Sequence, residues 1–131
     1  MPNHLNLSGN LMPLDSPKIM GILNCTPDSF YDGVQGRKTE DIVKKGLDQW
    51  NDGANLVDVG GQSSRPGAET VTAAGEWARI EPVIEGLLSA QPEILLSVDT
   101  FHAGVARWAL DAGAVLINDI TAGRDPDMWP M

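Results

Sequence analysis

The sequence predicts an α/β fold in which helices cover a parallel β-sheet. Two observations lead to this fold class: short, continuous apolar segments recur along the chain, and longer segments with an apolar stripe of helical period separate them. Short continuous apolar segments are typical of strands buried on both faces. Strands that alternate with helices are joined as parallel neighbours by crossover helices. The four expected strands cover about residues 19–24, 54–60, 94–99 and 114–119.

The intervening segments each place their apolar side chains on one face of a helix. We expect helices over about residues 39–50, 72–89 and 102–111. Thr39 is suited to cap the first of them, because a threonine hydroxyl accepts a hydrogen bond from a free backbone N–H of the first turn. Pro82 lies inside the second, where proline removes a backbone donor, so we expect a kink or a break there.

The length of the chain sets the size of the predicted sheet. A complete (β/α)8 barrel needs about 250 residues, whereas this chain has 131. Four strands and three helices therefore predict the first half of a (β/α)8 barrel. Residues 4–14 alternate weakly around Ser8-Gly9-Asn10, which favours a small hairpin before the first core strand. We expect a single incomplete barrel domain over residues 1–131, with the N-terminal hairpin in 1–16 and the strands and helices in 17–131.

Composition and charge exclude several classes of function. A net charge of −9 repels phosphate backbones and anionic lipid, so we expect neither nucleic acid nor a membrane surface as a partner. No apolar segment approaches the ~20 residues of a membrane span. The N-terminus lacks the pattern of a secretory signal, and a single cysteine, Cys25, allows no internal disulfide framework. These features favour the cytoplasm.

Polar residues follow or end each of the four predicted strands. Ligands of parallel α/β sheets bind at the carboxyl ends of the strands. Carboxylates accept paired hydrogen bonds, and asparagine both donates and accepts, so such a rim suits a neutral heterocycle with several N–H donors. The alternative is that each polar residue only begins a loop or caps a helix. The residues concerned are Asn24, Asp58, Asp99, Asn118 and Asp119.

Two long connections after the first and second strands have unusual composition. Residues 26–33 and 60–67 combine glycine and proline with hydroxyl groups and a charge. Glycine allows a ligand to approach the backbone closely, and Arg65 is a bidentate donor for phosphate. The same composition also makes ordinary turns, and composition alone favours that interpretation.

At this point the sequence motifs resemble those of a known family. Residues 19–30, followed by Asp32-Gly33, resemble the opening motif of dihydropteroate synthase, and residues 57–68 resemble its second motif. Residues 96–100 and 117–120 are similar to the ends of its third and fourth strands. The resemblance covers about residues 14–131 in order and without large gaps.

The resemblance implies a TIM barrel, usually a homodimer, that works in folate biosynthesis. The family joins 4-aminobenzoate to 6-hydroxymethyl-7,8-dihydropterin diphosphate and releases diphosphate, and Mg²⁺ assists the leaving group. Asp32 and Arg65 would be catalytic, and Ser64 and Arg65 would hold the diphosphate or order the second loop. The other implied contacts are Asn24 with the Mg²⁺–diphosphate, Asp99 and Asn118 with the pterin ring, Phe30 and Pro66 with the aminobenzoate, and Asp32 with the cation on the pterin methylene.

Some features depart from the family pattern. Gln62 stands where the family usually has glutamate, and Ser64 replaces the usual threonine. The family takes a further pterin-binding aspartate, a lysine and an Arg-x-His phosphate site from the second half of its barrel. We therefore expect that the isolated 131-residue chain does not turn over. Two alternatives stay open: a non-catalytic pterin-binding or assembly segment that needs a partner, and a relative of the pterin-dependent methyltransferases.

Overall fold

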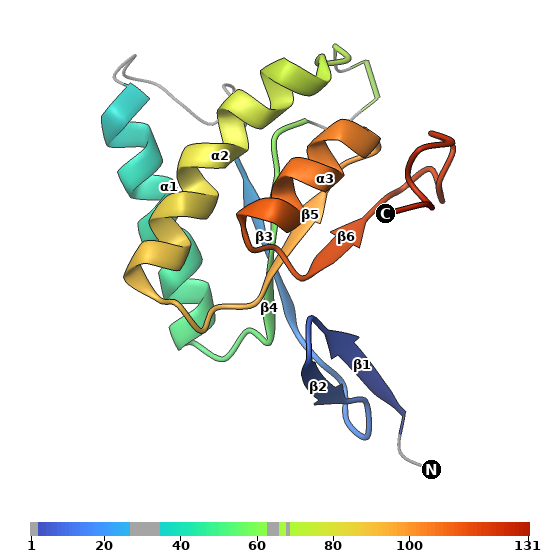
Figure 1. The fold of residues 1–131 in the computed structure, drawn as a ribbon. Coiled ribbons are helices and arrows are strands. Elements are labelled where there is room, and N and C mark those ends of the chain that lie inside the picture. The colour runs from blue at the N-terminus through green and yellow to red at the C-terminus, as the bar shows by residue number, and fades with distance from the viewer. Residues whose placement is uncertain (1–2, 27–34, 63–65, 68) are drawn as a thin grey trace.

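The computed structural model describes residues 3–26, 35–62, 66–67 and 69–131. A hairpin comes first, and strands then alternate with helices (Figure 1). The elements are β1 (His4–Leu7), β2 (Asn10–Pro13), β3 (Met20–Asn24), α1 (Gln35–Asn51), β4 (Leu56–Gly60), α2 (Ala73–Ala90), β5 (Leu96–Asp99), α3 (Ala103–Ala112) and β6 (Leu116–Asn118).

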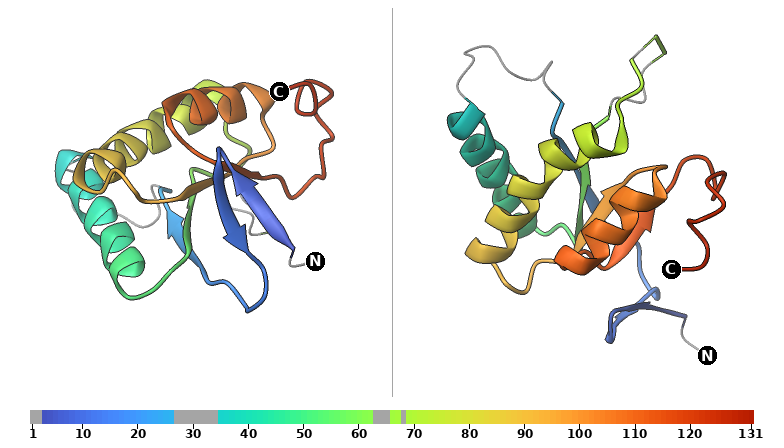
Figure 2. Two further views of the ribbon diagram at one scale, coloured as in Figure 1. Left: turned by 60° about the horizontal axis from the view of Figure 1, so that its bottom comes forward. Right: turned by 45° about the horizontal axis from the view of Figure 1, so that its top comes forward.

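The main sheet has four parallel strands in the order β3-β4-β5-β6. Each strand pairs with the next one in the sequence, as the alternation of strands and helices predicted. The three helices lie on one face of this sheet, and the hairpin lies near the amino-terminal ends of the strands (Figures 1 and 2). None of the described helices is both long and apolar enough to cross a membrane.

The core lies between the sheet and the helices. Side chains alternate between the two faces of a strand, and the helix-facing set is almost wholly apolar. Its strand members include Leu23, Val57, Val59, Leu96 and Val98, none of which is more than 1% exposed. Isoleucine, valine and leucine side chains of α2 and smaller residues of α3 cover them. This burial of apolar surface is the main stabilising contribution to the sheet.

The hairpin turns through Ser8 and Gly9, which have φ angles of 51° and 91°. Positive φ at both central residues is the type I′ geometry that suits a two-residue hairpin loop. The side-chain oxygen of Asn6 accepts a hydrogen bond from the Gly9 N–H at 2.8 Å. The predicted hairpin around Ser8-Gly9-Asn10 is thereby confirmed.

One local prediction about the helices was wrong, and a second was met only in part by the structure. Thr39 lies inside α1, which begins at Gln35, so it does not cap this helix. Of the kink or break expected at Pro82, the break is absent, since the second helix continues through this residue. Its buried face on both sides of the proline, which includes Ile80 and Ile84 at 0% exposure, offsets the lost hydrogen bond.

Glycines allow α1 and α2 to approach each other closely. A Cβ added at Gly46 would lie 2.8 Å from a methyl carbon of Leu87 and 2.9 Å from one of Leu23. Both leucines are fully buried, so neither can move aside without disturbing the core. Gly46 therefore sets the distance between α1, α2 and β3.

This packing leads to a prediction about two helical glycines. Gly46→Ala should lower the free energy of unfolding by about 1–3 kcal/mol, because the new methyl group overpacks the core. Gly104→Ala in α3 is the matched control, since its Cβ would meet nothing within 4 Å. The control should gain up to about 1 kcal/mol from helix propensity. Urea unfolding measures both, and equal stabilisation by the two variants would contradict this account of the core.

Candidate functional site

The sheet face away from the helices carries polar side chains at its carboxyl edge. Strand register aligns Asn24 with Gly60, Gly60 with Asp99, and Asp99 with Asn118. The neighbouring residues Leu23, Val59 and Val98 belong to the helix-facing core, so the alternation of side chains puts this row on the opposite face. Three predicted site residues, Asn24, Asp99 and Asn118, are thus brought to one level of the sheet.

Asp58 lies one row below them on the same face. Its side chain is only 5% exposed. The Asn118 amide nitrogen donates a hydrogen bond to one Asp58 carboxylate oxygen at 3.2 Å. The other oxygen, Oδ1, is buried and has no hydrogen-bond partner in the described part of the chain. Buried polar atoms normally have a partner, so this oxygen is an acceptor that a ligand or a bound water can satisfy.

Ser97 adds a second such atom to the same row. Its register partner is Asp58. The Ser97 hydroxyl is fully buried and likewise has no partner among the described residues. The row below Asn24, Asp99 and Asn118 therefore contains two buried polar atoms without a hydrogen-bond partner among the described residues.

The ionised form of Asp99 is disfavoured by its surroundings. Burial raises the pKa of its carboxyl, and the negative charges of Asp58 and Asp119 raise it further. A neutral group with adjacent N–H donors would satisfy this carboxylate and offset its desolvation. Gly60 leaves room for such a group, because a Cβ there would lie 3.6 Å from the Asp99 Cβ and 3.8 Å from Oδ2.

The side chain of Asp119 binds the loop that follows it. Its carboxylate accepts hydrogen bonds from the Thr121 N–H, the Thr121 hydroxyl and the Gly123 N–H, each at 2.8 Å. Although burial alone would raise the pKa of Asp119, these donors lower it. For this residue the alternative that polar residues after strands begin loops is the better description.

The remaining predicted site residues are not assembled by the described structure. Pro66 lies exposed in the connection between β4 and α2. Phe30, Asp32, Ser64 and Arg65 lie outside the described residues. No group of three or more histidine, cysteine, aspartate or glutamate side chains that could hold a metal ion occurs in the described ranges.

Sequence reasoning missed Ser97 as a residue of this site, and it named Asp58 but placed it one row too near the edge. It took Asp58 as the end of a strand, but β4 continues to Gly60, which moves Asp58 one row into the sheet. Ser97 was treated only as part of an apolar strand. The available signal was the alternation of side chains, because Ser97 and Asp99 are two residues apart and must share a face.

A separate pocket of about 370 Å³ lies beyond the ends of β5 and β6. Its lining residues are Phe101, His102, Thr121, Arg124 and Asp125. None of the predicted site residues is among them, so the pocket and the Asp99 row are distinct.

The family model described as pterin binding enzyme matches residues 20–131. This chain belongs to that family. The matched range contains every residue of the row described above. The polar edge with Asp99 and Asn118 is therefore part of a pterin-binding enzyme fold.

The chain is similar to several proteins whose names include dihydropteroate synthase. It is 48% identical over 110 residues to the probable bifunctional folylpolyglutamate synthase/dihydropteroate synthase of Halobacterium salinarum, covering 84% of this chain and 13% of that protein. Xanthomonas albilineans dihydropteroate synthase with 4-aminobenzoic acid matches at a TM-score of 0.88 and 45% identity, covering 98% of this chain and 46% of that one. The same enzyme in complex with 7,8-dihydropteroate matches at 0.82 and 42% identity, covering 96% and 45%.

The chain spans less than half the length of each of these proteins. Its four strands and three helices correspond to part of their fold. The predicted fold class, the first half of a (β/α)8 barrel with an N-terminal hairpin, is thereby confirmed.

Charge removal at Asp99 should stabilise the chain at neutral pH. The pKa of Asp99 is higher in the folded chain than in the unfolded chain. At a pH above the folded pKa, the ionised carboxylate therefore lowers the free energy of unfolding. At a pH below the unfolded pKa, the carboxyl is protonated in both states and this loss of stability disappears. Asp99→Asn should raise Tm by about 2–4 °C at pH 7, and by much less near pH 4. Asp41→Asn, exposed on α1, is the control and should leave Tm unchanged. A gain independent of pH would contradict this explanation.

Cys25 should be unreactive in the folded chain. It is 3% exposed, and burial raises the pKa of its thiol to about 12. Because the thiolate is the reactive form, iodoacetamide at pH 8 should alkylate the folded chain at least about a thousandfold more slowly than the urea-unfolded chain. Mass spectrometry follows the reaction, and equal rates in the two states would refute the burial of this thiol.

Proposed function

We propose that the protein carrying this chain is a dihydropteroate synthase. It would join 4-aminobenzoate to 6-hydroxymethyl-7,8-dihydropterin diphosphate and release diphosphate. The observation that carries the proposal is the row in which Asp99, with its raised pKa, lies level with Asn118 at the carboxyl edge of a parallel sheet. Residues 1–131 would supply the pterin-ring side of the active site.

The chemistry of the row suits a pterin ring. The ring presents an exocyclic amine beside a ring N–H, and a carboxylate accepts such a pair of donors. Asp99 is the carboxylate for this contact, and Asn118 can donate and accept at once. Because Asn118 is itself held by Asp58 at 3.2 Å, its amide is oriented before the ligand arrives. Pre-oriented groups lose less freedom on binding.

The reaction separates charge along the bond that breaks. When the amine of 4-aminobenzoate attacks the pterin methylene, the C–O bond loosens, positive charge develops on the pterin side and negative charge on the diphosphate. We propose that the Asp32 carboxylate stabilises the first and the Arg65 guanidinium, with Ser64, the second. The amine is neutral at pH 7 and needs no strong base.

The residues present fit a magnesium ion that takes most of its ligands from the diphosphate. Mg²⁺ prefers oxygen ligands and often uses only one or two from the protein beside phosphates and water. Asn24 offers an exposed side-chain oxygen at the end of β3. We propose Asn24 as its protein ligand, and the ion would supply positive charge to the departing diphosphate.

The remaining parts of the proposal concern partners and setting. Phe30 and Pro66 would frame the aminobenzoate, and closure of the two loops would keep water from the developing cation. The resemblance also supports a homodimer. The free, buried thiol of Cys25 suits a reducing compartment, and we propose the cytoplasm.

An assay of the protein as its host produces it tests this function. It should form dihydropteroate from the two substrates and release one diphosphate for each. Asp99→Asn should weaken binding of the pterin diphosphate by about 100-fold or more, since a site built for a hydrogen-bonded pair loses its acceptor. The exposed Asp41→Asn should match the parent. Isothermal titration gives the affinities.

The outcomes separate the alternatives. Methyl transfer from a folate without diphosphate release would identify a methyltransferase relative. Pterin binding without turnover by the host-produced protein would identify a non-catalytic binding segment. We expect the isolated residues 1–131 to form no dihydropteroate, and product from a purified 14.0 kDa chain would overturn that expectation.

A further inference from the structure

A buried glutamate joins three segments behind the pterin row. Glu76 lies in the first turn of α2 and is 1% exposed. It belongs to none of the motifs used above. Charged side chains are rarely buried without a partner, so its contacts indicate why a carboxylate stands at this position.

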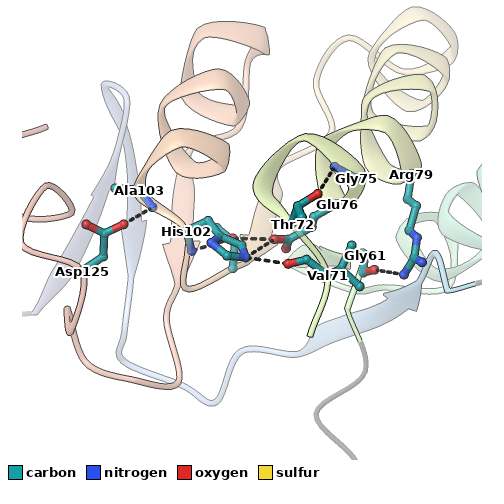
Figure 3. Close-up of polar contacts among 10 residues, drawn as sticks. Gly61, Val71, Thr72, Gly75, Glu76, Arg79, His102, Ala103 and Asp125 are labelled. Atoms are coloured by element: carbon teal, nitrogen blue, oxygen red, sulfur yellow. Dashed lines mark hydrogen bonds and ion pairs between the residues drawn. The ribbon is translucent and has the colours of Figure 1, made fainter. Parts of the chain in front are cut away.

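The first set of contacts leads to the end of β5. The Thr100 hydroxyl donates to Glu76 Oε2 at 3.1 Å, and the same hydroxyl oxygen accepts from the His102 N–H at 3.1 Å. The His102 ring nitrogen Nε2 lies 3.9 Å from Glu76 Oε2 (Figure 3). Thr100 directly follows Asp99, so this carboxylate holds the backbone that carries the Asp99 side chain.

The second set of contacts leads to the β4–α2 connection. His102 Nε2 donates to the Val71 carbonyl at 2.9 Å, and Arg79 donates to the Gly61 carbonyl at 2.8 Å (Figure 3). A Cβ at Gly61 would lie 3.0 Å from the Glu76 carbonyl oxygen and 3.1 Å from its Cγ. Both ends of the connection are therefore tied to the neighbourhood of Glu76.

The charges around Glu76 oppose each other. Burial raises the pKa of its carboxyl, while the Thr100 hydrogen bond and the charges of His102 and Arg79 act in the lowering direction. The negative charge of Asp99 acts in the same direction as burial and raises the pKa of Glu76 further. Glu76 Oε1 has no hydrogen-bond partner among the described residues. An apolar side chain of the same size would avoid these costs, so stability alone does not explain the carboxylate.

We propose that Glu76 is a positioning residue for pterin binding. Through Thr100 it fixes the direction of Asp99, and through His102 it fixes the stem of the β4–α2 connection beside the same edge. It contacts no ligand itself. This inference rests on the proposed function, because its readout is the affinity for the pterin substrate.

The test uses paired variants of the protein as its host produces it, with dihydropterin diphosphate as the titrated probe. Thr100→Val removes the hydroxyl that Glu76 binds, and Thr100→Ser keeps it. Glu76→Gln removes the charge, and Glu85→Gln, exposed on the same helix, is the matched control. We expect Kd to rise about tenfold for Thr100→Val and Glu76→Gln, the loss typical of one hydrogen bond to a charged group. Thr100→Ser and Glu85→Gln should stay within about twofold of the parent.

A double-mutant cycle separates positioning from general stability. If Glu76 acts through Asp99, then Glu76→Gln in the Asp99→Asn background should change Kd by less than about twofold. Equal tenfold losses in both backgrounds would overturn the inference, as would parent-like binding by Thr100→Val or loss of binding by Thr100→Ser. If Glu76→Gln fails to fold, the comparison of Thr100→Val with Thr100→Ser still tests the positioning role. A parent that binds no pterin would contradict the proposed function itself, whereas a parent that binds while the variants match it contradicts only the positioning role.

Discussion

The register of the parallel sheet is the constraint on which the site depends. Asn24, Asp99 and Asn118 come from three strands that are far apart in sequence, and only the ladder of backbone hydrogen bonds brings them level. A slip of one residue in any strand would turn its polar side chain towards the helices and an apolar one towards the ligand. The position of these side chains at the site therefore depends first on the register of the strands.

Packing against the helices fixes that register. Val57, Val59 and Val98 are completely buried on the helix face, and a slipped strand would expose them and bury Asp58 or Asp99 against hydrocarbon. Burying an unpaired charge costs far more than the packing could offset. The apolar face thus selects one register, and the polar face uses it. The cost that remains appears in Asp99, whose pKa is raised by burial and by neighbouring carboxylates.

The sequence could predict those parts of the structure that local patterns encode. Strand positions follow from continuous apolar segments, and the hairpin follows from the alternation around Ser8-Gly9-Asn10, although its turn type comes only from the structure. The polar row followed from the rule that ligands bind at the carboxyl ends of parallel strands. The row of Asp58 could not be predicted in this way, because it depends on where β4 ends within the register. The position of Ser97 follows from its spacing to Asp99, but its lack of a hydrogen-bond partner among the described residues appears only in the structure. The contacts around Glu76 could not be predicted from the sequence either, because they join residues that are distant along the chain. Glu76 binds Thr100, 24 residues away, and Arg79 on the same helix binds Gly61, 18 residues away.

The central claim is that the pterin ring binds Asp99 and Asn118 at this edge, and nuclear magnetic resonance tests it most directly. The side-chain amide of Asn118, which donates a hydrogen bond to Asp58, has resonances separate from those of the backbone. Titration of the ¹⁵N-labelled protein with dihydropterin diphosphate should move these resonances and the backbone signals of Asp99 in parallel, at a single affinity. Shifts confined to the pocket of Phe101 and Arg124, with the Asn118 amide unchanged at saturation, would contradict the account.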